Sequence, residues 1–292
     1  MRQQAVCVSR DPEVRRIVAD ALATAGLGVE FRDELTEGLA GFALIVVDRA
    51  ARVEAGDALR AAGAPVVVVG DSLDDDGLIA LMLDAPVSHL VADPKDRDLG
   101  ITSGKLASGD VFGLEKYVAP GTAVRERVVD DDAGKRAAMG EVCAWAEGVG
   151  ARRPVVHRIA NVVDELLMNA MLDAPRESRP ALLPGGKPVL RWACDDAVMA
   201  ISVSDAYGAI RQRDVIDHVR RARDERGRPQ PSGADEPGAG LGLYLVLSNV
   251  ASLIVNVEPG RRTEVVCLFD VSRRERRAVD TGVRSLHVFA AP

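Results

Sequence analysis

The first hundred residues alternate short apolar runs with segments of helical periodicity, and this order strongly limits the possible folds. Strands are expected at Ala5–Val8, Leu27–Phe31, Ala43–Val47, Pro65–Val69 and His89–Val91. Helices are expected at Pro12–Ala25, Glu54–Ala62 and Asp76–Asp84. Asp11 is a suitable N-cap for the first helix, and Pro12 suits its first position. Apolar strands that alternate with helices indicate a doubly wound parallel sheet covered on both faces, so we expect an α/β domain.

This region resembles a response-regulator receiver domain in the order of its elements and in three local sequences. SRDPEVRRIV resembles the first strand-to-helix turn, ALIVVDR places Asp48 at the end of the third strand, and Ala92–Pro94 resembles the turn after the fifth strand. Receivers carry their phospho-accepting aspartate at the position of Asp48. The resemblance implies a flavodoxin-like fold and a role in signalling.

The residues that support phosphorylation in receivers are replaced in this chain. Ser9 and Arg10 stand where receivers have the acidic pair that binds magnesium. Gly70 stands in place of a small hydroxyl residue, and Asp93 in place of a lysine. Without the acidic pair, magnesium cannot neutralise a phosphoryl group at Asp48. We therefore interpret the domain as a pseudo-receiver, in which Asp48 resembles a phospho-acceptor but is inactive.

The segment Val155–Pro175, VVHRIANVVDELLMNAMLDAP, has the pattern of one long amphipathic helix. Its apolar residues recur at helical spacing. Its polar residues lie four apart and form a row along one side: Asn161, Glu165, Asn169 and Asp173. An acid and an amide one turn apart can hold a divalent cation and a water beside a phosphate chain. Such a pair is a weak signal by itself, and we interpret Asn161 as structural.

The segments that follow predict two hairpins and a glycine-rich helix start. Strands are expected at Pro188–Cys194, Ala197–Ser204, Leu253–Val257 and Glu264–Asp270. The pair Asp195 and Asp196 suits the first hairpin turn. Between the hairpins lie SDAYGAI, a charged segment at Arg211–Pro237, and GAGLGLYLV, which begins another helix. No strand precedes this glycine run, so a dinucleotide-binding fingerprint is not favoured.

In this order the segments resemble the GHKL ATP-binding superfamily, which includes gyrase-type ATPases, sensor kinases and anti-sigma-factor kinases. DELLMNA resembles its N box, SDAYGAI a degenerate first glycine box, GAGLGLYLV the second glycine box, and GRRTEV the strand that ends the nucleotide site. The resemblance covers residues 135 to 270. It implies a C-terminal two-layer α/β sandwich, the Bergerat fold, with ATP and Mg²⁺ as cofactors.

The resemblance also implies a role for individual residues. Glu165 would be the general base, Asn169 the magnesium ligand, and Asp205 the acceptor of a hydrogen bond from the adenine amino group. Glycines at a helix start would let backbone N–H groups approach the phosphates. The implied cofactor-binding residues are Asn169, Asp173, Asp205, Gly208, Gly238, Gly240, Gly242 and Thr263.

The first glycine box departs from the family pattern. Tyr207 stands where the family has glycine, and Gly208 follows one place later. This shift alters how the loop packs under the adenine. Tyr207 either stacks near the base or packs into the core, and we favour packing. The segment Arg211–Pro237 corresponds to the ATP lid, whose arginines either reach the phosphates or stay in solvent.

Three functions remain open: a protein kinase of the anti-sigma type that phosphorylates Ser or Thr, a slow ATPase that acts as a conformational timer, and a non-catalytic nucleotide-binding module that recruits a partner. A histidine autokinase is not favoured. His157 lies on the same helix as Glu165, and His218 lies in the lid segment. The expected partner is a signalling protein or a protein substrate, and the chain could form a homodimer.

Length and composition limit the remaining possibilities. At 292 residues the chain is expected to form two domains. We place a receiver-like domain at 1–100, a linker at 101–122, the GHKL domain at 123–275 and a tail at 276–292. The net charge of −7 argues against nucleic acid as the partner. The four cysteines lack metal-ligand spacing. No signal peptide or membrane span is found, so a cytoplasmic location is expected.

Three short segments carry weaker expectations. Asp93–Gly113 is rich in Asp, Gly, Ser and Lys and is interpreted as a linker. In the DVFGLEKYV segment that follows, Phe112, Leu114 and Tyr117 could dock the connector onto one of the domains. Acidic residues at 130–132 are expected to cap a helix over Lys135–Gly148. In the tail, SLHVF could add a strand or pack on the other domain.

Overall fold

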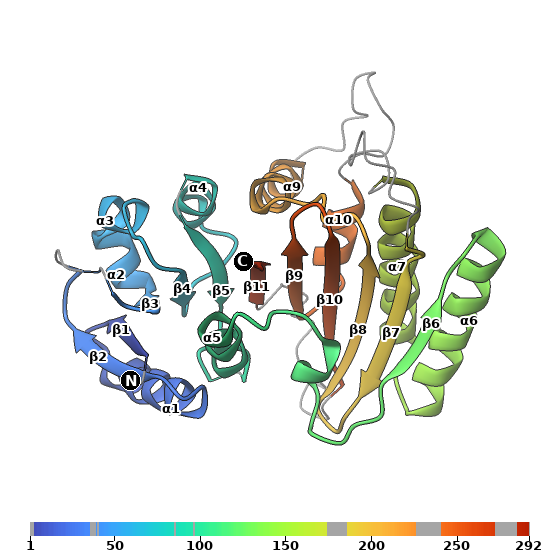
Figure 1. Ribbon diagram of the computed structural model, residues 1–292, viewed down its shortest axis with the longest axis horizontal. Coiled ribbons are helices and arrows are strands. Elements are labelled where there is room, and N and C mark those ends of the chain that lie inside the picture. The colour runs from blue at the N-terminus through green and yellow to red at the C-terminus, as the bar shows by residue number, and fades with distance from the viewer. Residues whose placement is uncertain are drawn as a thin grey trace. The chain divides into compact units, whose positions relative to one another are not determined.

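A computed structural model describes residues 3–35, 39, 41–84, 86–95, 97–173, 186–225, 241–271 and 285–291. The protein is α/β, with both parallel and antiparallel strands. It divides into two compact units (Figure 1). Unit 1 comprises Met1–Val111 and Arg284–Phe289, and unit 2 comprises Phe112–Val283 and Ala290–Pro292. The segment assigned to a linker is therefore shared between them, and part of the tail belongs to unit 1.

Unit 1 is built on a parallel sheet with the strand order β2-β1-β3-β4-β5. The strands are β1 (Gln4–Val8), β2 (Gly28–Arg32), β3 (Leu44–Asp48), β4 (Val66–Val69) and β5 (Val87–Val91). All four residues of β4 are valines with no exposed surface. β-branched side chains on both faces suit a strand that is covered from both sides. The five predicted strand segments are confirmed.

Five helices accompany this sheet: α1 (Pro12–Thr24), α2 (Arg49–Glu54), α3 (Gly56–Arg60), α4 (Asp76–Asp84) and α5 (Asp98–Ser108). Asp11 caps α1 as expected, because its carboxylate accepts the backbone N–H of Glu13 at 2.7 Å. α1 and α5 cover one face of the sheet, where Val18, Leu22 and Leu99 are fully buried.

Two predictions for unit 1 are wrong in detail. The helix expected at Glu54–Ala62 is two shorter helices, α2 and α3, separated at Ala55. The first begins immediately after β3 because Asp48 caps it. Asp93–Gly113 is not only a linker, because it contains the whole of α5. Its glycines and serines have low helix propensity and hide the pattern, although Leu99 and Thr102 are buried.

The C-terminal strand β11 (Ser285–Ala290) pairs antiparallel with β5, which confirms the alternative in which SLHVF adds a strand. His287 lies directly opposite His89, and each side chain is only 1% exposed. The ammonium group of Lys105 lies 3.7 Å from the centre of the Phe289 ring, and Thr102 Oγ1 lies 3.4 Å from His287 Nδ1. A buried polar cluster therefore joins α5, β5 and β11.

We expect this cluster to make the protein less stable in acid. Burial, followed by the neighbouring charge of Lys105, lowers the pKa of His287 from 6.5 to about 3. Burial, His287 and Lys105 together lower the pKa of His89 well below 6.5. The unfolded chain therefore binds more protons than the folded chain between pH 6.5 and 3. The contribution of each histidine to the free energy of unfolding is fully present above pH 6.5. Below pH 6.5 it decreases by up to about 1.4 kcal/mol per pH unit for each histidine.

Urea unfolding between pH 7.5 and 4.5 measures this loss. Every carboxylate also titrates toward acid, so the informative quantity is the difference between variants. His287→Gln should flatten the pH dependence, whereas His157→Gln, at an exposed position on a helix of unit 2, should leave it unchanged. Parallel pH profiles for His287→Gln and the wild type would contradict the prediction.

Unit 2 is built on an antiparallel sheet with the strand order β9-β10-β8-β7-β6. The strands are β6 (Arg125–Val128), β7 (Val189–Cys194), β8 (Val198–Asp205), β9 (Ser252–Glu258) and β10 (Arg262–Asp270). Both predicted hairpins are confirmed. Asp195 forms the first turn, where its Oδ1 accepts the N–H groups of Ala197 and Val198 at 2.8 Å each. The edge strand β6 was not expected, because its sequence is mostly charged.

One face of this sheet is covered by helices, as Figure 1 shows for α7 and α10. The helices are α6 (Asp132–Gly148), α7 (Arg153–Met168), α9 (Gln212–Glu225) and α10 (Leu241–Leu247). Asp131 caps α6 by accepting the N–H of Gly134 at 2.7 Å, as expected for an acidic helix start. Trp145 of α6 packs edge-on against Trp192 of β7, with ring centres 6.5 Å apart.

The opposite face of the sheet is covered by the connector, which we define as Phe112–Val118. It contains the 3₁₀ helix η1 (Leu114–Tyr117), which contacts β7 and β8. Leu114 and Tyr117 are almost fully buried, so the expected docking of this cluster is confirmed. In the described part of the chain, no helix combines the length and apolar character needed to cross a membrane.

Candidate functional site

The predicted acid, Glu165, lies on helix α7, and the predicted amide, Asn169, follows its last residue. The apolar stripe of α7 is buried, and the side chains of Glu165 and Asn169 are both half-buried. The backbone N–H of Asn169 bonds to the carbonyl groups of Glu165 and Leu166, so the acid and the amide lie one turn apart at the end of the α-helical segment. Asn161 is exposed, which agrees with its interpretation as structural polarity.

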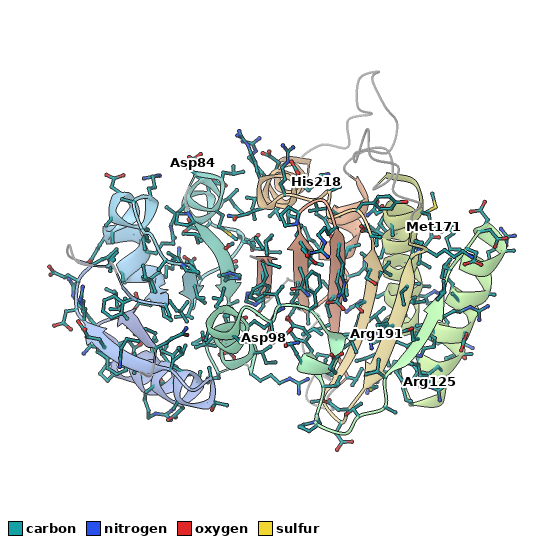
Figure 2. The ribbon with its side chains drawn as sticks, in the orientation of Figure 1. Asp84, Asp98, Arg125, Met171, Arg191 and His218 are labelled. Carbon is teal, nitrogen blue, oxygen red and sulfur yellow. The ribbon has the colours of Figure 1, made fainter. Side chains whose placement is uncertain are left out.

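The predicted continuous α-helix to Pro175 is wrong at its C-terminal end. After Met168 the chain continues as a π-helix, η2 (Asn169–Asp173), in which Met171 is visible in Figure 2. A π-turn is wider than an α-turn, so the four-residue row of polar side chains does not continue unchanged from Asn169 to Asp173. The side chain of Asp173 lies outside the described residues.

Asp205 ends β8 on the helix-covered face of the sheet. Its Oδ1 accepts the backbone N–H of Tyr207 at 2.8 Å. Burial raises the pKa of the Asp205 carboxyl above its usual value, while hydrogen bonds from Tyr207, Gly208 and Thr263 act in the opposite direction. A carboxylate held in this way has one oxygen fixed by the chain and is partly removed from solvent. It is suited to accept a hydrogen bond from a ligand.

Thr263 lies directly opposite Asp205 in the pairing of β10 with β8. Its side chain has no exposed surface, and its hydroxyl makes no hydrogen bond of normal geometry to any described residue. The hydroxyl is nevertheless close enough to Asp205 to lower the pKa of that carboxyl. Buried polar groups are nearly always partnered. The pair therefore offers an acceptor and an unused hydroxyl side by side at the end of β8.

Gly208 has a structural role that the sequence did not reveal. Its φ is +60°, and its carbonyl accepts the N–H of Gly260 at 3.1 Å in the turn between β9 and β10. A Cβ at this position would overlap the carbonyl oxygen of Glu258 and lie 2.8 Å from the Arg261 nitrogen. The glycine therefore lets two loops touch. Tyr207, which precedes it, is half-buried.

Gly208→Ala should destabilise the protein by more than about 1 kcal/mol, because the substitution adds both a backbone clash and an unfavourable φ. The shift of the urea midpoint at pH 7.5 measures the effect. Gly140→Ala is the matched control, since a Cβ there meets no atom within 4 Å and the position lies inside α6. Equal stability of the two variants would mean that the loops do not pack in this way.

The predicted phosphate-binding glycines lie largely outside the described residues. Gly238 and Gly240 are not described, and Gly242 lies in the first turn of α10. α10 contacts both α7 and α9. The segment Arg211–Pro237, expected to be a lid, begins with helix α9. Arg211 pairs there with Asp214 at 2.9 Å, and Arg220 pairs with Asp217 at 2.9 Å.

In unit 1, Asp48 is engaged in local structure. Its Oδ1 accepts the N–H of Ala51 at 2.8 Å and so caps α2, while its Oδ2 accepts a short hydrogen bond from the hydroxyl of Ser9. Arg10 pairs with Glu34 at 2.9 Å and with Glu54 at 3.0 Å. These groups line or border a cleft of about 520 Å³ at the carboxyl ends of the strands, whose lining includes Gly70.

Two residues at the receiver-like positions of unit 1 are held in local contacts. Ser9 stands at the first position where receivers have a magnesium-binding acid, and its hydroxyl donates to Asp48. Arg10 stands at the second such position, and its guanidinium pairs with Glu34 and Glu54. Among the described residues, no group of three or more His, Cys, Asp and Glu side chains is arranged to hold a metal ion.

Sequence reasoning did not identify the buried carboxylate of Glu264. Glu264 on β10 has no exposed surface, and its Oε2 accepts hydrogen bonds from the Gly113 N–H and the Asn256 amide. The signal was present as a single charged residue in the otherwise apolar strand TEVVCLF. A charge that interrupts a buried strand requires a specific partner. In this case the partners are the connector and the neighbouring strand.

A search of protein-family models gave no match to the chain, and a search of curated proteins gave none either.

Proposed function

We propose that unit 2 binds Mg–ATP as a GHKL-type domain and uses it for phosphotransfer to a protein or for slow hydrolysis. The observation that carries this proposal is the pairing of half-buried Asp205 with fully buried Thr263. The carboxylate accepts the Tyr207 N–H at Oδ1, and the Thr263 hydroxyl beside it makes no hydrogen bond of normal geometry to any described residue. An adenine amino group is a donor that suits the first, and a ring nitrogen or a bridging water suits the second.

The residues present fit the cofactor at both ends of such a site. Asp205 and Thr263 would hold the base, and Asn169 would supply a side-chain oxygen to Mg²⁺. The bound metal neutralises phosphate charge and thereby favours transfer of the γ-phosphoryl group. Glu165, one turn before Asn169, would accept a proton from a water or a protein hydroxyl as that oxygen attacks. Glu165 and Asp205 lie on α7 and β8, two well-packed elements that would hold their side chains in place.

Unit 1, by the same proposal, is a receiver-like domain that does not use Asp48 for phosphotransfer. The capping and Ser9 contacts of Asp48, together with the Arg10 ion pairs, support this reading. The domain would then serve as a binding surface for a signalling partner. The whole protein would be a cytoplasmic signalling protein that responds to nucleotide.

Calorimetric titration of the wild-type protein with ATP in the presence and absence of Mg²⁺ tests the proposal. Binding that is stronger with Mg²⁺, followed by ADP formation or labelling of a protein substrate, is the expected result. Absence of ATP binding would refute the proposal. Tight binding without turnover or transfer would favour the second candidate, a non-catalytic nucleotide-binding module. This candidate is worth testing because Tyr207 stands where the family has glycine.

A further inference from the structure

Three consecutive residues of β10 face two different environments. Thr263 points to the helix-covered face, beside Asp205. Arg262 and Glu264 point to the opposite face, because side chains alternate along a strand. The carboxylate of Glu264 accepts the backbone N–H of Gly113 at 2.9 Å, and the guanidinium of Arg262 lies 4.1 Å from the centre of the Phe112 ring. One short stretch of backbone therefore contacts both the proposed nucleotide site and the connector.

The connector is held by specific contacts. Gly113 has a φ of +111°, which other residues rarely adopt. The ammonium group of Lys116 donates to the carbonyl of Phe112, and Arg191, labelled in Figure 2, reaches Glu115 at 3.5 Å. The 3₁₀ turn buries Leu114 completely. These contacts fix the connector in one conformation on the sheet.

The attachment of the connector matters energetically because Glu264 is buried. Its Oε2 accepts hydrogen bonds from Gly113 and, at 3.0 Å, from Asn256, while its Oε1 has no hydrogen-bond partner among the residues that the structure describes. If the connector left the sheet, the carboxylate would lose one of its two hydrogen bonds and gain access to water. A buried charge is stable only while it is partnered. Release of the connector is therefore unfavourable as long as the Glu264 carboxylate keeps its place on β10.

We propose that nucleotide binding and docking of the connector are coupled through β10. This inference rests on the proposed function, because it concerns regulation of the same site. A nucleotide that engages Thr263 and Asp205 restrains the start of β10, and the same backbone then holds Arg262 and Glu264 in place beneath the connector. By reciprocity, a docked connector raises nucleotide affinity by the same factor. The connector is the N-terminal segment of unit 2, so its docking could report the nucleotide state to the chain that precedes it.

Hydrogen–deuterium exchange of the full-length protein tests the coupling. Saturating Mg–ATP should slow exchange in residues 112–118 by about 5-fold or more, the lower range for coupled sites. The edge strand β6 is the internal reference, because general stabilisation by a ligand would slow it as well. The expected result is therefore slowing in the connector that exceeds the slowing in β6.

Two variants remove contacts to the connector without altering Asp205 or Thr263. Glu264→Ala should weaken Mg–ATP affinity by about 5-fold or more and abolish the nucleotide effect on the connector. Phe112→Ala removes the ring under Arg262 and leaves the strand core unchanged, so it tests the same coupling if Glu264→Ala fails to fold. Glu141→Ala, which removes the exposed ion pair between Glu141 of α6 and Arg127 of β6, is the control and should bind as the wild type does.

The outcomes separate the two proposals. If the wild type binds Mg–ATP but the connector exchanges at an unchanged rate, the coupling is refuted and the nucleotide-binding function stands. The same conclusion follows if Phe112→Ala binds ATP as tightly as Glu141→Ala does. If the wild type binds no nucleotide, the proposed function and the coupling are both refuted.

Discussion

Replacement of Glu165 by glutamine is expected to lower ATP turnover by about 10²–10⁴-fold while Mg–ATP binding is retained. Glutamine keeps the size of the side chain and its place on α7, but it cannot accept a proton from the attacking oxygen. The loss should therefore appear in kcat, because the lost interaction forms only as the proton moves. Steady-state turnover together with calorimetric binding separates the two quantities.

Asp164 provides the matched control, since it is the adjacent carboxylate on the same helix. Its Oδ1 pairs with the ammonium group of Lys135 at 2.7 Å, and its side chain is 48% exposed. Asp164→Asn should lower turnover only slightly. If the two variants lose turnover equally, or if Glu165→Gln stays within a few-fold of the wild type, Glu165 is not the base.

Replacement of Asp205 by asparagine is expected to weaken ATP binding by about 10–100-fold, because a hydrogen bond to a charged group contributes about 1.5–3 kcal/mol. Oδ1 accepts the Tyr207 N–H, so in the proposed complex the adenine amino group would donate to the second oxygen. Asparagine places an NH₂ group at one of these two positions. In one orientation of the amide its NH₂ group faces the Tyr207 N–H, and in the other it faces the adenine amino group, so two donors oppose each other in both cases.

The same geometry predicts a change in base preference. Inosine triphosphate presents a carbonyl where ATP presents an amino group, so the wild type should prefer ATP strongly. Asp205→Asn should reduce that preference, because its amide can donate to the carbonyl. Competition titrations with the two nucleotides measure the ratio, and Asp196→Asn at the exposed β7–β8 turn is the control. An unchanged preference in Asp205→Asn would show that this carboxylate does not read the base.

The elements that could be predicted from the sequence are those whose local pattern agrees with their environment. The β4 run of four valines has one plausible structure, and α4 occurs at the predicted bounds of Asp76–Asp84. Asp11 and Asp131 cap their helices because capping depends on only a few neighbouring residues. At the site, Glu165 and Asn169 were placed one turn apart by helical periodicity alone. The opposition of Asp205 and Thr263 follows once the two hairpins are paired in register.

The elements that escaped prediction depend on tertiary contacts. α5 contains glycines and buried polar residues, and its helical pattern is evident only once the sheet beneath it is known. Nothing in NAMLD distinguishes a π-turn from an α-turn. The need for glycine at position 208 arises from a second loop, which follows more than forty residues later. The contact between Glu264 and Gly113 joins residues 151 positions apart, which no local pattern can reveal.

The pairing of β11 with β5 has a consequence for how the protein is made. His89 and His287 lie about 200 residues apart in the sequence, so forming their contact closes a very long loop. Contacts of this kind form late in folding. During synthesis the first five strands leave the ribosome well before the strand that completes their sheet. The open side of β5 therefore keeps unpaired backbone groups until residues 285–290 have been translated. A stop codon just before Ser285 would spare every residue of the proposed site and still leave the N-terminal sheet incomplete and prone to aggregate.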